Sequence, residues 1–234
     1  MRRSVVARAW VGMILALLGT GSPLAAEPLP PGWKVCNVGD QEIVLPPPEG
    51  DFVLVGPECR EWVRRSLAGG DRILAVWVPP DFRCELSPGE ETKDPERAAQ
   101  VFADRDFEDV RMRPAVFQAM VNGIESLFAA LYDDDDPASS ADERKAIFGA
   151  DADKGEYLGV FFRDERALAM GLTAELEEDG EPVKVMGGFG FLLVRGKMIG
   201  TVLFLRDGDE ASVDTLRDTT RRWMEAILDA NPEP

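Results

Sequence analysis

The stretch VKVMGGFGFLLVRGKMIGTVLFL, residues 183–205, is the most informative part of this chain about its architecture. Its apolar, β-branched and aromatic runs at 183–194 and 198–205 predict two strands, and Gly196 between them predicts a tight turn. No helix follows the glycine cluster at 187–190. We therefore interpret the cluster as a strand with a bulge or a close backbone approach, and not as a phosphate-binding loop.

Two more strand-like runs precede this stretch, at 157–163 and 167–176. Asp164-Glu165 separates these two runs, and Asp179-Gly180, the strongest hairpin signal in the chain, leads into 183–194. Because the four runs follow one another with only short turns between them, they predict an antiparallel meander.

Helices are predicted on either side of the meander. The clearer one covers 114–131, where a proline stands in the first turn and the apolar residues form one stripe. A second helix is predicted from an N-cap at Ser212 to Asn231-Pro232. The first stripe comprises Phe117, Met120, Val121, Ile124, Leu127, Phe128 and Leu131, and the second comprises Val213, Leu216, Trp223, Met224, Ile227 and Leu228.

The N-terminal half alternates proline-rich and apolar segments. Residues 27–41 are predicted to form an extended lead-in, because prolines crowd this part of the chain. For 98–104 the alanines favour a helix, whereas Val101-Phe102 in a short bounded run favours a strand, which we prefer. The other expected elements are short apolar runs at 42–45 and 51–55, a helix at 58–67 and a strand at 72–78.

Consecutive strands with helices gathered before and after them predict an α+β domain, in which amphipathic helices pack on a largely antiparallel, meander-type sheet. We expect one such domain over 42–231, preceded by the lead-in and by a separate leader at 1–26. A chain of this size can bury a sizeable core without disulfide staples.

The leader has the three parts of a secretory signal peptide. Arg2, Arg3 and Arg8 make a basic start, 9–19 is an uncharged apolar stretch, and small residues at 22–26 suit signal peptidase. The apolar stretch is far shorter than the roughly 20 residues that span a bilayer. We predict cleavage after Ala26 and a soluble periplasmic or secreted protein with no stable membrane anchor.

The charge balance excludes some partners. The chain has 26 basic and 43 acidic residues, and removal of the leader, which carries three arginines and no acid, takes the net charge from −17 to −20. Phosphate backbones and anionic membrane surfaces repel so acidic a domain. We therefore expect no nucleic-acid partner, and an unknown protein or small-molecule partner instead.

The residue inventory also narrows the chemistry. The chain contains no histidine, which excludes mechanisms built on an imidazole base and removes the commonest zinc ligand. The sequence has no G-x-S-x-G, Walker A, S-x-x-K or C-x-x-C motif. We predict no cofactor, no metal site and no catalytic residue.

Several conspicuous residues have structural explanations. The run Asp133–Asp136 could bind calcium, but we interpret it as a solvated loop, and 151–156 departs from an EF-hand loop after its first residues. Arg221-Arg222 could bind an anion, but the macrodipole and nearby acids explain the pair. Trp62, Trp77 and Trp223 fall at positions expected to face the core.

The three cysteines are Cys36, Cys59 and Cys84, and an oxidising compartment allows one disulfide and one free thiol. Cys59 shares the helical stripe of Trp62 and is the cysteine expected to be buried as a small apolar residue. We therefore predict a Cys36–Cys84 bond, with Cys59–Cys84 as the runner-up.

The order of elements resembles that of uncharacterised exported bacterial proteins. The features that carry the resemblance are LPPPEG at 45–50, RILAVWV at 72–78, the late hairpin RGK at 195–197 and the tryptophan-bearing final helix. This architecture is similar to the α/β sandwich of the PsbP-like and DcrB-like proteins. The resemblance implies an accessory, assembly or binding role and carries no functional residues.

Two function classes follow. The first is an exported, non-catalytic accessory or binding protein of the periplasm. The alternative is a carboxylate-dependent periplasmic hydrolase, which would need two carboxylates converging in a concave pocket roughly 5 to 10 Å apart.

Overall fold

The computed structural model describes residues 28–59, 62–63, 71–84, 95–132, 155–178, 181–206 and 210–233. The chain divides into two compact units, 1–30 and 31–234, and every element below belongs to the second. The strands are β1 Lys34–Val38, β2 Gln41–Leu45, β3 Val53–Leu54, β4 Arg72–Val78, β5 Arg97–Ala103, β6 Gly155–Asp164, β7 Ala167–Glu178, β8 Glu181–Val194 and β9 Lys197–Arg206. The helices are the 3-10 turn η1 Pro57–Cys59, α2 Pro114–Leu131 and α4 Glu210–Ala230.

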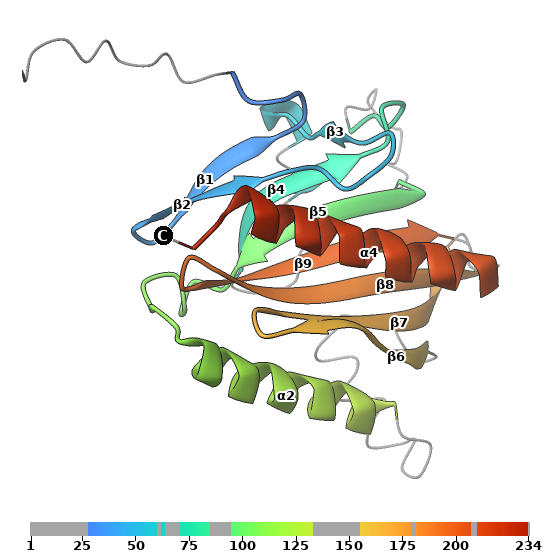
Figure 1. Ribbon diagram of the computed structural model, residues 1–234. Helices are drawn as coiled ribbons and strands as arrows, with labels where there is room; N and C mark the ends of the chain where they lie inside the picture. The colour runs from blue at the N-terminus through green and yellow to red at the C-terminus, as the bar shows by residue number, and fades with distance from the viewer. Residues whose placement is uncertain are drawn as a thin grey trace, which may run out of the picture. The chain divides into compact units, whose positions relative to one another are not determined.

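The main sheet has seven strands in the order β3-β4-β5-β9-β8-β7-β6, and every neighbouring pair is antiparallel (Figure 1). Strands β6 to β9 form the predicted meander. Residues 98–104 lie within or directly after β5, a strand, as preferred. The predicted α+β class with a largely antiparallel sheet is confirmed.

The β8–β9 turn consists of Arg195 and Gly196 alone, because Val194 pairs with Lys197. Both turn residues have positive φ, 50° at Arg195 and 76° at Gly196, as a type I′ turn requires. Gly196 adopts this conformation without strain, whereas an arginine does so at some cost. The Arg195 guanidinium donates to the Glu42 carbonyl at 2.8 Å, which ties the turn to β2.

Several boundaries differ from the prediction. The lead-in is not simply extended, because residues 34–38 form β1 and pair with β2 in a separate two-stranded sheet. Helix α4 begins at Glu210, before the predicted cap at Ser212. Of the helix predicted at 58–67, the structure describes a 3-10 turn at 57–59 and helical residues at 62–63.

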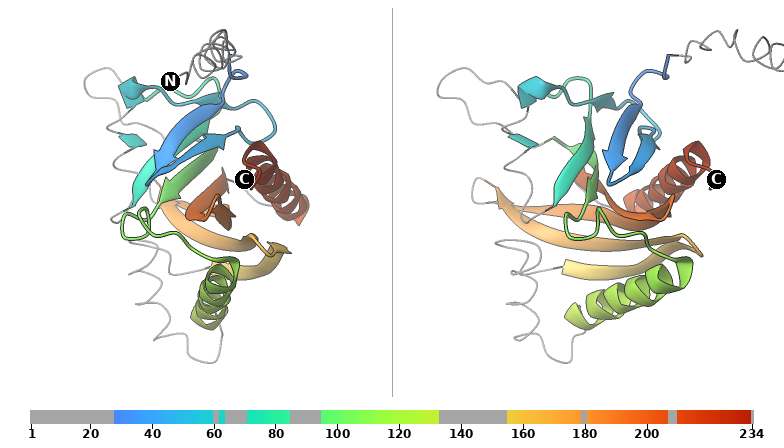
Figure 2. Two further views of the ribbon diagram at one scale, coloured as in Figure 1. Left: turned by 60° about the vertical axis from the view of Figure 1, so that its left-hand side comes forward. Right: turned by 90° about the vertical axis from the view of Figure 1, so that its left-hand side faces the viewer.

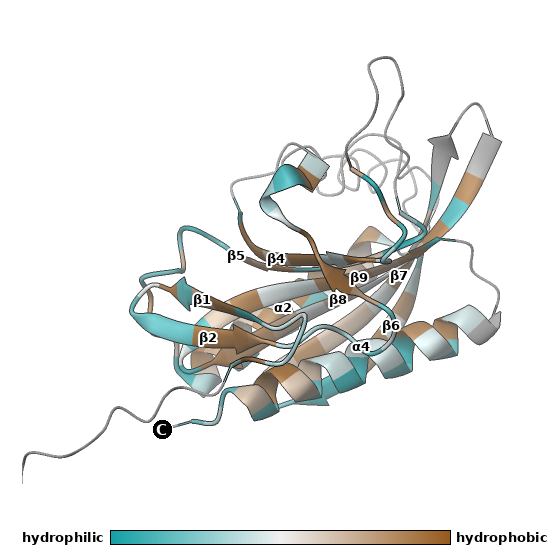
Figure 3. Cartoon of the chain, turned by 90° about the horizontal axis from the view of Figure 1, so that it is seen from above, coloured by the Kyte–Doolittle hydropathy of each residue, from teal (hydrophilic) through white to brown (hydrophobic). Residues whose placement is uncertain are grey.

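The two long helices pack on opposite faces of the sheet, as the right-hand view of Figure 2 shows. Alternation along β7 supplies both faces: Ala167 and Ala169 join the cluster under α4, and Leu168 and Met170 join the cluster under α2. In Figure 3 the central strands are mainly brown, and α4 carries both brown and teal as an amphipathic helix does.

The glycine cluster of β8 allows α4 to approach the sheet closely. A Cβ atom at Gly188 would overlap the Thr220 hydroxyl, and one at Gly190 would meet the side chains of Thr201 and Met224. The predicted close backbone approach is confirmed. The predicted core positions of the tryptophans are confirmed as well, since Trp62, Trp77 and Trp223 are at most 7% exposed.

Helix α2 is long and apolar enough to cross a membrane by length and composition alone, although no such segment was expected after the leader. Four of its side chains are buried where the helix packs on the sheet. They are Phe117, Val121, Phe128 and Leu131.

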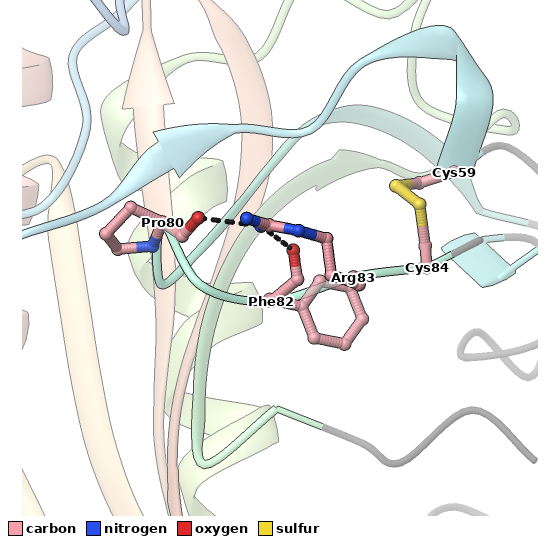
Figure 4. The surroundings of a disulfide bond; sticks show 5 residues. All are labelled: Cys59, Pro80, Phe82, Arg83 and Cys84. Carbon is pink, nitrogen blue, oxygen red and sulfur yellow. Dashed lines mark hydrogen bonds between the residues drawn. A yellow bond between two sulfur atoms is a disulfide. The ribbon is translucent and has the colours of Figure 1, made fainter. Parts of the chain in front are cut away.

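The predicted Cys36–Cys84 bond is wrong. The disulfide joins Cys59 to Cys84, whose Cα atoms are 5.3 Å apart, and Cys36 is free (Figure 4). Cys59 is buried, as predicted, but it lies in the same apolar cluster as Cys84. Trp62 and Phe82 pack at 4.8 Å between ring centroids and hold the two segments together. Cys36 belongs to β1 and packs against the core under α4.

Candidate ligand-binding cleft

An open cleft of about 910 Å³ lies at one end of the sheet. The start of α2, the β6–β7 turn, the β8–β9 turn and the end of α4 surround it, and all four lie on the left of Figure 1. Its lining consists of Arg111, Met112, Arg113, Pro114, Glu165, Arg166, Leu193, Gly196, Leu228, Asp229, Pro232 and Glu233.

The buried lining of the cleft is apolar. Met112, Leu193 and Leu228 are each at most 7% exposed and come from three separate segments. Backbone bonds hold the segments together, since Met112 N–H donates to the Gly196 carbonyl and Leu193 N–H donates to the Arg166 carbonyl, both at 2.8 Å. The cleft therefore has an apolar base that backbone hydrogen bonds hold in place.

Two exposed arginines, Arg111 and Arg113, line the cleft beside the start of α2. The aliphatic part of Arg111 lies over Gly196, where an added Cβ would come within 3.0 Å of Cγ. Arg113 is the N-cap residue of α2, and the first turn contains no acid. No ion pair to either arginine is found among the described residues. Since a helix N-terminus favours negative charge, Arg113 at the N-cap is unfavourable there by about 0.3–1 kcal/mol, and Arg111 adds a second positive charge two residues before it.

Acids line the cleft beside the end of α4. Asp229 is in the last turn of α4, which contains no basic residue, and Glu233 follows the helix. A helix C-terminus favours positive charge, so acids here are again the unfavourable choice. Both helix ends at the cleft thus carry the charge that their own dipole disfavours, and the two charges have opposite signs.

The β6–β7 turn contributes one charge of each sign, Glu165 and Arg166. Arg166 pairs with Glu233 at 3.6 Å, and this contact links the turn to the acidic residues. The Gln118 amide donates to the carbonyls of Asp164 and Glu165, both at 3.0 Å, which ties α2 to the same turn.

Buried polar side chains hold the acidic side and the arginine side of the cleft in place. The Asn231 amide donates to the Val44 and Ile227 carbonyls at 2.6 and 2.8 Å and accepts from Val44 N–H at 2.8 Å, which anchors the end of α4 to β2. On the other side Lys197 is 2% exposed and donates to the Glu108 carbonyl at 2.9 Å, in the loop that leads to Arg111.

Lys197 also pairs with Asp40 at 3.0 Å, in the turn between β1 and β2. The hydrogen bond from Lys197, with a further one from Gln41, lowers the pKa of the exposed Asp40 carboxyl from its usual value. The ammonium group is thus held by an acid and a carbonyl, and we interpret Lys197 as a structural residue.

The conspicuous residues of the sequence analysis that the structure describes, Arg221-Arg222 and the tryptophans, do not line this cleft. Arg222 pairs with Glu49 at 2.8 Å, in keeping with its structural explanation. The run Asp133–Asp136 and residues 151–154 lie outside the described residues. Within the described ranges no group of three or more potential metal-ligating residues is found. The charge reversal at both helix ends is the sequence signal that could have indicated Arg111, Arg113 and Asp229.

Fold and cleft together define an α+β protein with a helix on each face of an antiparallel sheet and a charged cleft at one end. No protein-family model and no curated protein matches the chain.

Three solved structures match most of the length of this chain at low sequence identity and low TM-score. A point mutant of the protein Mog1 shows 14% identity and a TM-score of 0.31, covering 84% of this chain and 92% of that one. The Saccharomyces cerevisiae Ran-binding protein Mog1p shows 13% identity and a TM-score of 0.32, covering 81% and 86%. LpqN, involved in cell envelope biogenesis of Mycobacterium tuberculosis, shows 13% identity and a TM-score of 0.25, covering 82% and 87%.

Proposed function

We propose that this chain is an exported, non-catalytic accessory or binding protein of the periplasm, and that its ligand site is the cleft at the end of the sheet, where the start of α2 and the end of α4 meet. The observation that carries the proposal is the cleft itself. Its volume of about 910 Å³ is within the range of roughly 300–1,000 Å³ typical of ligand sites, and it combines an apolar base with a few charged groups.

Two features support export. The leader at 1–26 has the composition of a secretory signal, and the Cys59–Cys84 bond is of a type that persists in oxidising compartments. Export also agrees with the resemblance to exported proteins with a PsbP-like or DcrB-like sandwich.

The second candidate is the carboxylate-dependent hydrolase. Glu165 and Asp229 line the same cleft from different elements. If this candidate holds, Glu165→Gln and Asp229→Asn will each abolish turnover of a susceptible substrate while leaving its binding in place. If the cleft only binds, no turnover is found and the substitutions change affinity alone.

The test of the binding function uses one blocking variant and one matched control. Pro232→Trp places an indole in the cleft, and Pro80→Trp makes the same change at an exposed turn at the end of β4. The exported proteins are purified under mild conditions, and the masses of the intact proteins and their complexes are measured by native mass spectrometry. We expect the polypeptide to begin at Glu27, and we expect a co-purifying ligand mass with wild type and Pro80→Trp but not with Pro232→Trp.

Two results would contradict this proposal. One is an intact leader in the membrane fraction. The other is a ligand that stays bound to Pro232→Trp as firmly as to wild type, because the binding site would then lie elsewhere.

A further inference from the structure

We propose that the cleft binds a ligand that carries a carboxylate and an ammonium group at opposite ends, and that this ligand is a short peptide with free termini. The proposal rests on the proposed function, since it takes the cleft as the binding site, and it adds the chemical class of the ligand.

The first argument is the separation of charge within the cleft. Arg111 and Arg113 lie beside the start of α2, whereas Asp229 and Glu233 lie beside the end of α4. The chain as a whole carries 43 acids against 26 bases, so two arginines without an ion pair among the described residues are conspicuous. A ligand with a single charge would satisfy one side and be repelled by the other.

The second argument is that neither helix explains its own charges. An acid at the start of α2 or a base at the end of α4 would stabilise each helix, yet the chain has the reverse at both ends, and both ends meet at one cleft. Charges that disfavour the local structure are expected where a ligand uses them. A peptide lying from one side to the other would compensate both.

The third argument is the chemistry of the groups. The planar guanidinium groups of Arg111 and Arg113 match a carboxylate through paired N–H donors. An ammonium group has three donors and no acceptor, which suits the carboxylate oxygens of Asp229 and the Glu233 oxygen that does not face Arg166. Between them the apolar base of Met112, Leu193 and Leu228 accommodates the uncharged middle of a peptide.

The test measures binding of four forms of one peptide, Ala-Leu-Ala, by isothermal titration calorimetry with the full mature protein at low salt. The forms have free termini, an acetylated N-terminus, an amidated C-terminus, or both blocks. We expect the free peptide to bind best, each single block to weaken binding by roughly tenfold, and the double block to weaken it further.

Variants assign each end of the peptide to its side of the cleft. In the double variant Arg111→Gln/Arg113→Gln, amidation of the peptide should no longer weaken binding, whereas acetylation still should. In Asp229→Asn the effect of acetylation should shrink while that of amidation persists. Arg111→Lys/Arg113→Lys keeps the charge but loses the paired donors, so it should restore only part of the discrimination. Arg105→Gln, which removes an exposed arginine outside the lining, is the control and should bind as wild type does.

Three outcomes would overturn the proposal: equal binding of all four forms, sensitivity to amidation alone, or binding unchanged in the arginine variant. Folding of each variant is checked by its melting temperature, and the single substitutions Arg111→Gln and Arg113→Gln replace the pair if the pair unfolds. If these peptides fail but Pro232→Trp still removes a co-purifying ligand, the ligand class is wrong and the cleft remains the binding site.

Discussion

Asn231 shows how a single buried amide positions one side of the cleft. It is fully buried and connects the end of α4 to β2, which is 187 residues away in the chain. Its side chain forms hydrogen bonds with two partly buried backbone groups of Val44 and with the buried carbonyl of Ile227, and the Ile227 carbonyl has no access to water to replace the amide. The position of Asp229 therefore depends on a residue that does not line the cleft.

We predict that Asn231→Ala destabilises the protein by about 2–4 kcal/mol, because it leaves buried backbone groups unsatisfied. For a domain of this size the melting temperature should fall by roughly 5–10 °C. Thermal and urea unfolding measure the change. Asn122→Ala on the exposed side of α2 is the control, because it removes only an exposed hydrogen bond from Arg163 and should have a much smaller effect. A loss no larger than that of the control would show that water replaces the amide.

The free thiol of Cys36 is predicted to react slowly. Burial raises its pKa from 9.0 to about 11, against a smaller opposing effect of Arg72 and Lys34. The thiolate fraction at pH 7.5 should therefore be about one hundredth of that of an unperturbed thiol, and the reactive form appears only as the pH rises towards 11. Alkylation by iodoacetamide, followed by mass spectrometry of the folded and urea-unfolded protein, should show this difference. Equal rates in both states would contradict it.

Between secondary-structure elements, the contact of α4 with β8 depends on glycines. Gly188 faces Thr220, a fully buried residue of α4 whose hydroxyl finds no hydrogen-bond partner in the part of the chain that the structure describes. The helix is therefore held against the sheet by close packing at this point, and not by a polar contact.

We predict that Gly188→Ala costs about 1–3 kcal/mol, because the new methyl group overlaps the Thr220 hydroxyl. Thr220→Ala should cost little alone, and in the double variant it should recover part of the loss, with a coupling above about 0.5 kcal/mol. A double-mutant cycle from urea unfolding measures the coupling.

Gly123→Ala in α2 is the matched control for this cycle. A Cβ atom there meets nothing within 4 Å, so a helix-favouring substitution should stabilise by about 0.5–1 kcal/mol. Strictly additive effects at Gly188 and Thr220 would mean that α4 shifts freely on the sheet.

In the molecule as a whole, the disulfide fastens the segment after β4 to the segment that follows β3. Cys59 and Cys84 are 25 residues apart, and the bond lies in an apolar cluster with Trp62, Val76 and Val78. The bond belongs to a cluster of its own, separate from the two that pack under α2 and α4.

We predict that replacing Cys59 and Cys84 together by alanine lowers the free energy of unfolding by about 3.5 kcal/mol, the chain entropy of a 25-residue loop. Cys36→Ala is the control and should have a smaller effect, since it breaks no covalent bond. Urea unfolding under non-reducing conditions measures both. Non-reducing peptide mapping of the wild type should give a Cys59–Cys84 peptide pair, and a pair containing Cys36 would contradict the structure.

Local patterns account for a large part of this molecule. The alternation and turns of 157–205 predicted the meander, and the stripe of 114–131 predicted α2, because strand and helix periods are properties of neighbouring residues. The core positions of Trp77 and Trp223 followed from the same periods. The charges of the cleft were equally present in the sequence, but nothing local indicated that they meet.

Long-range packing selects which segments become neighbours. Four features join residues that are distant in the chain. They are the pairing of β5 with β9, the packing of the β1–β2 hairpin under α4, the disulfide between Cys59 and Cys84, and the assembly of the cleft. Such contacts depend on the shape and burial of surfaces that exist only once the sheet has formed. The spacing of residues along the sequence does not reveal these contacts. For this reason the strands could be predicted from local patterns, whereas the predicted disulfide partner of Cys84 was wrong.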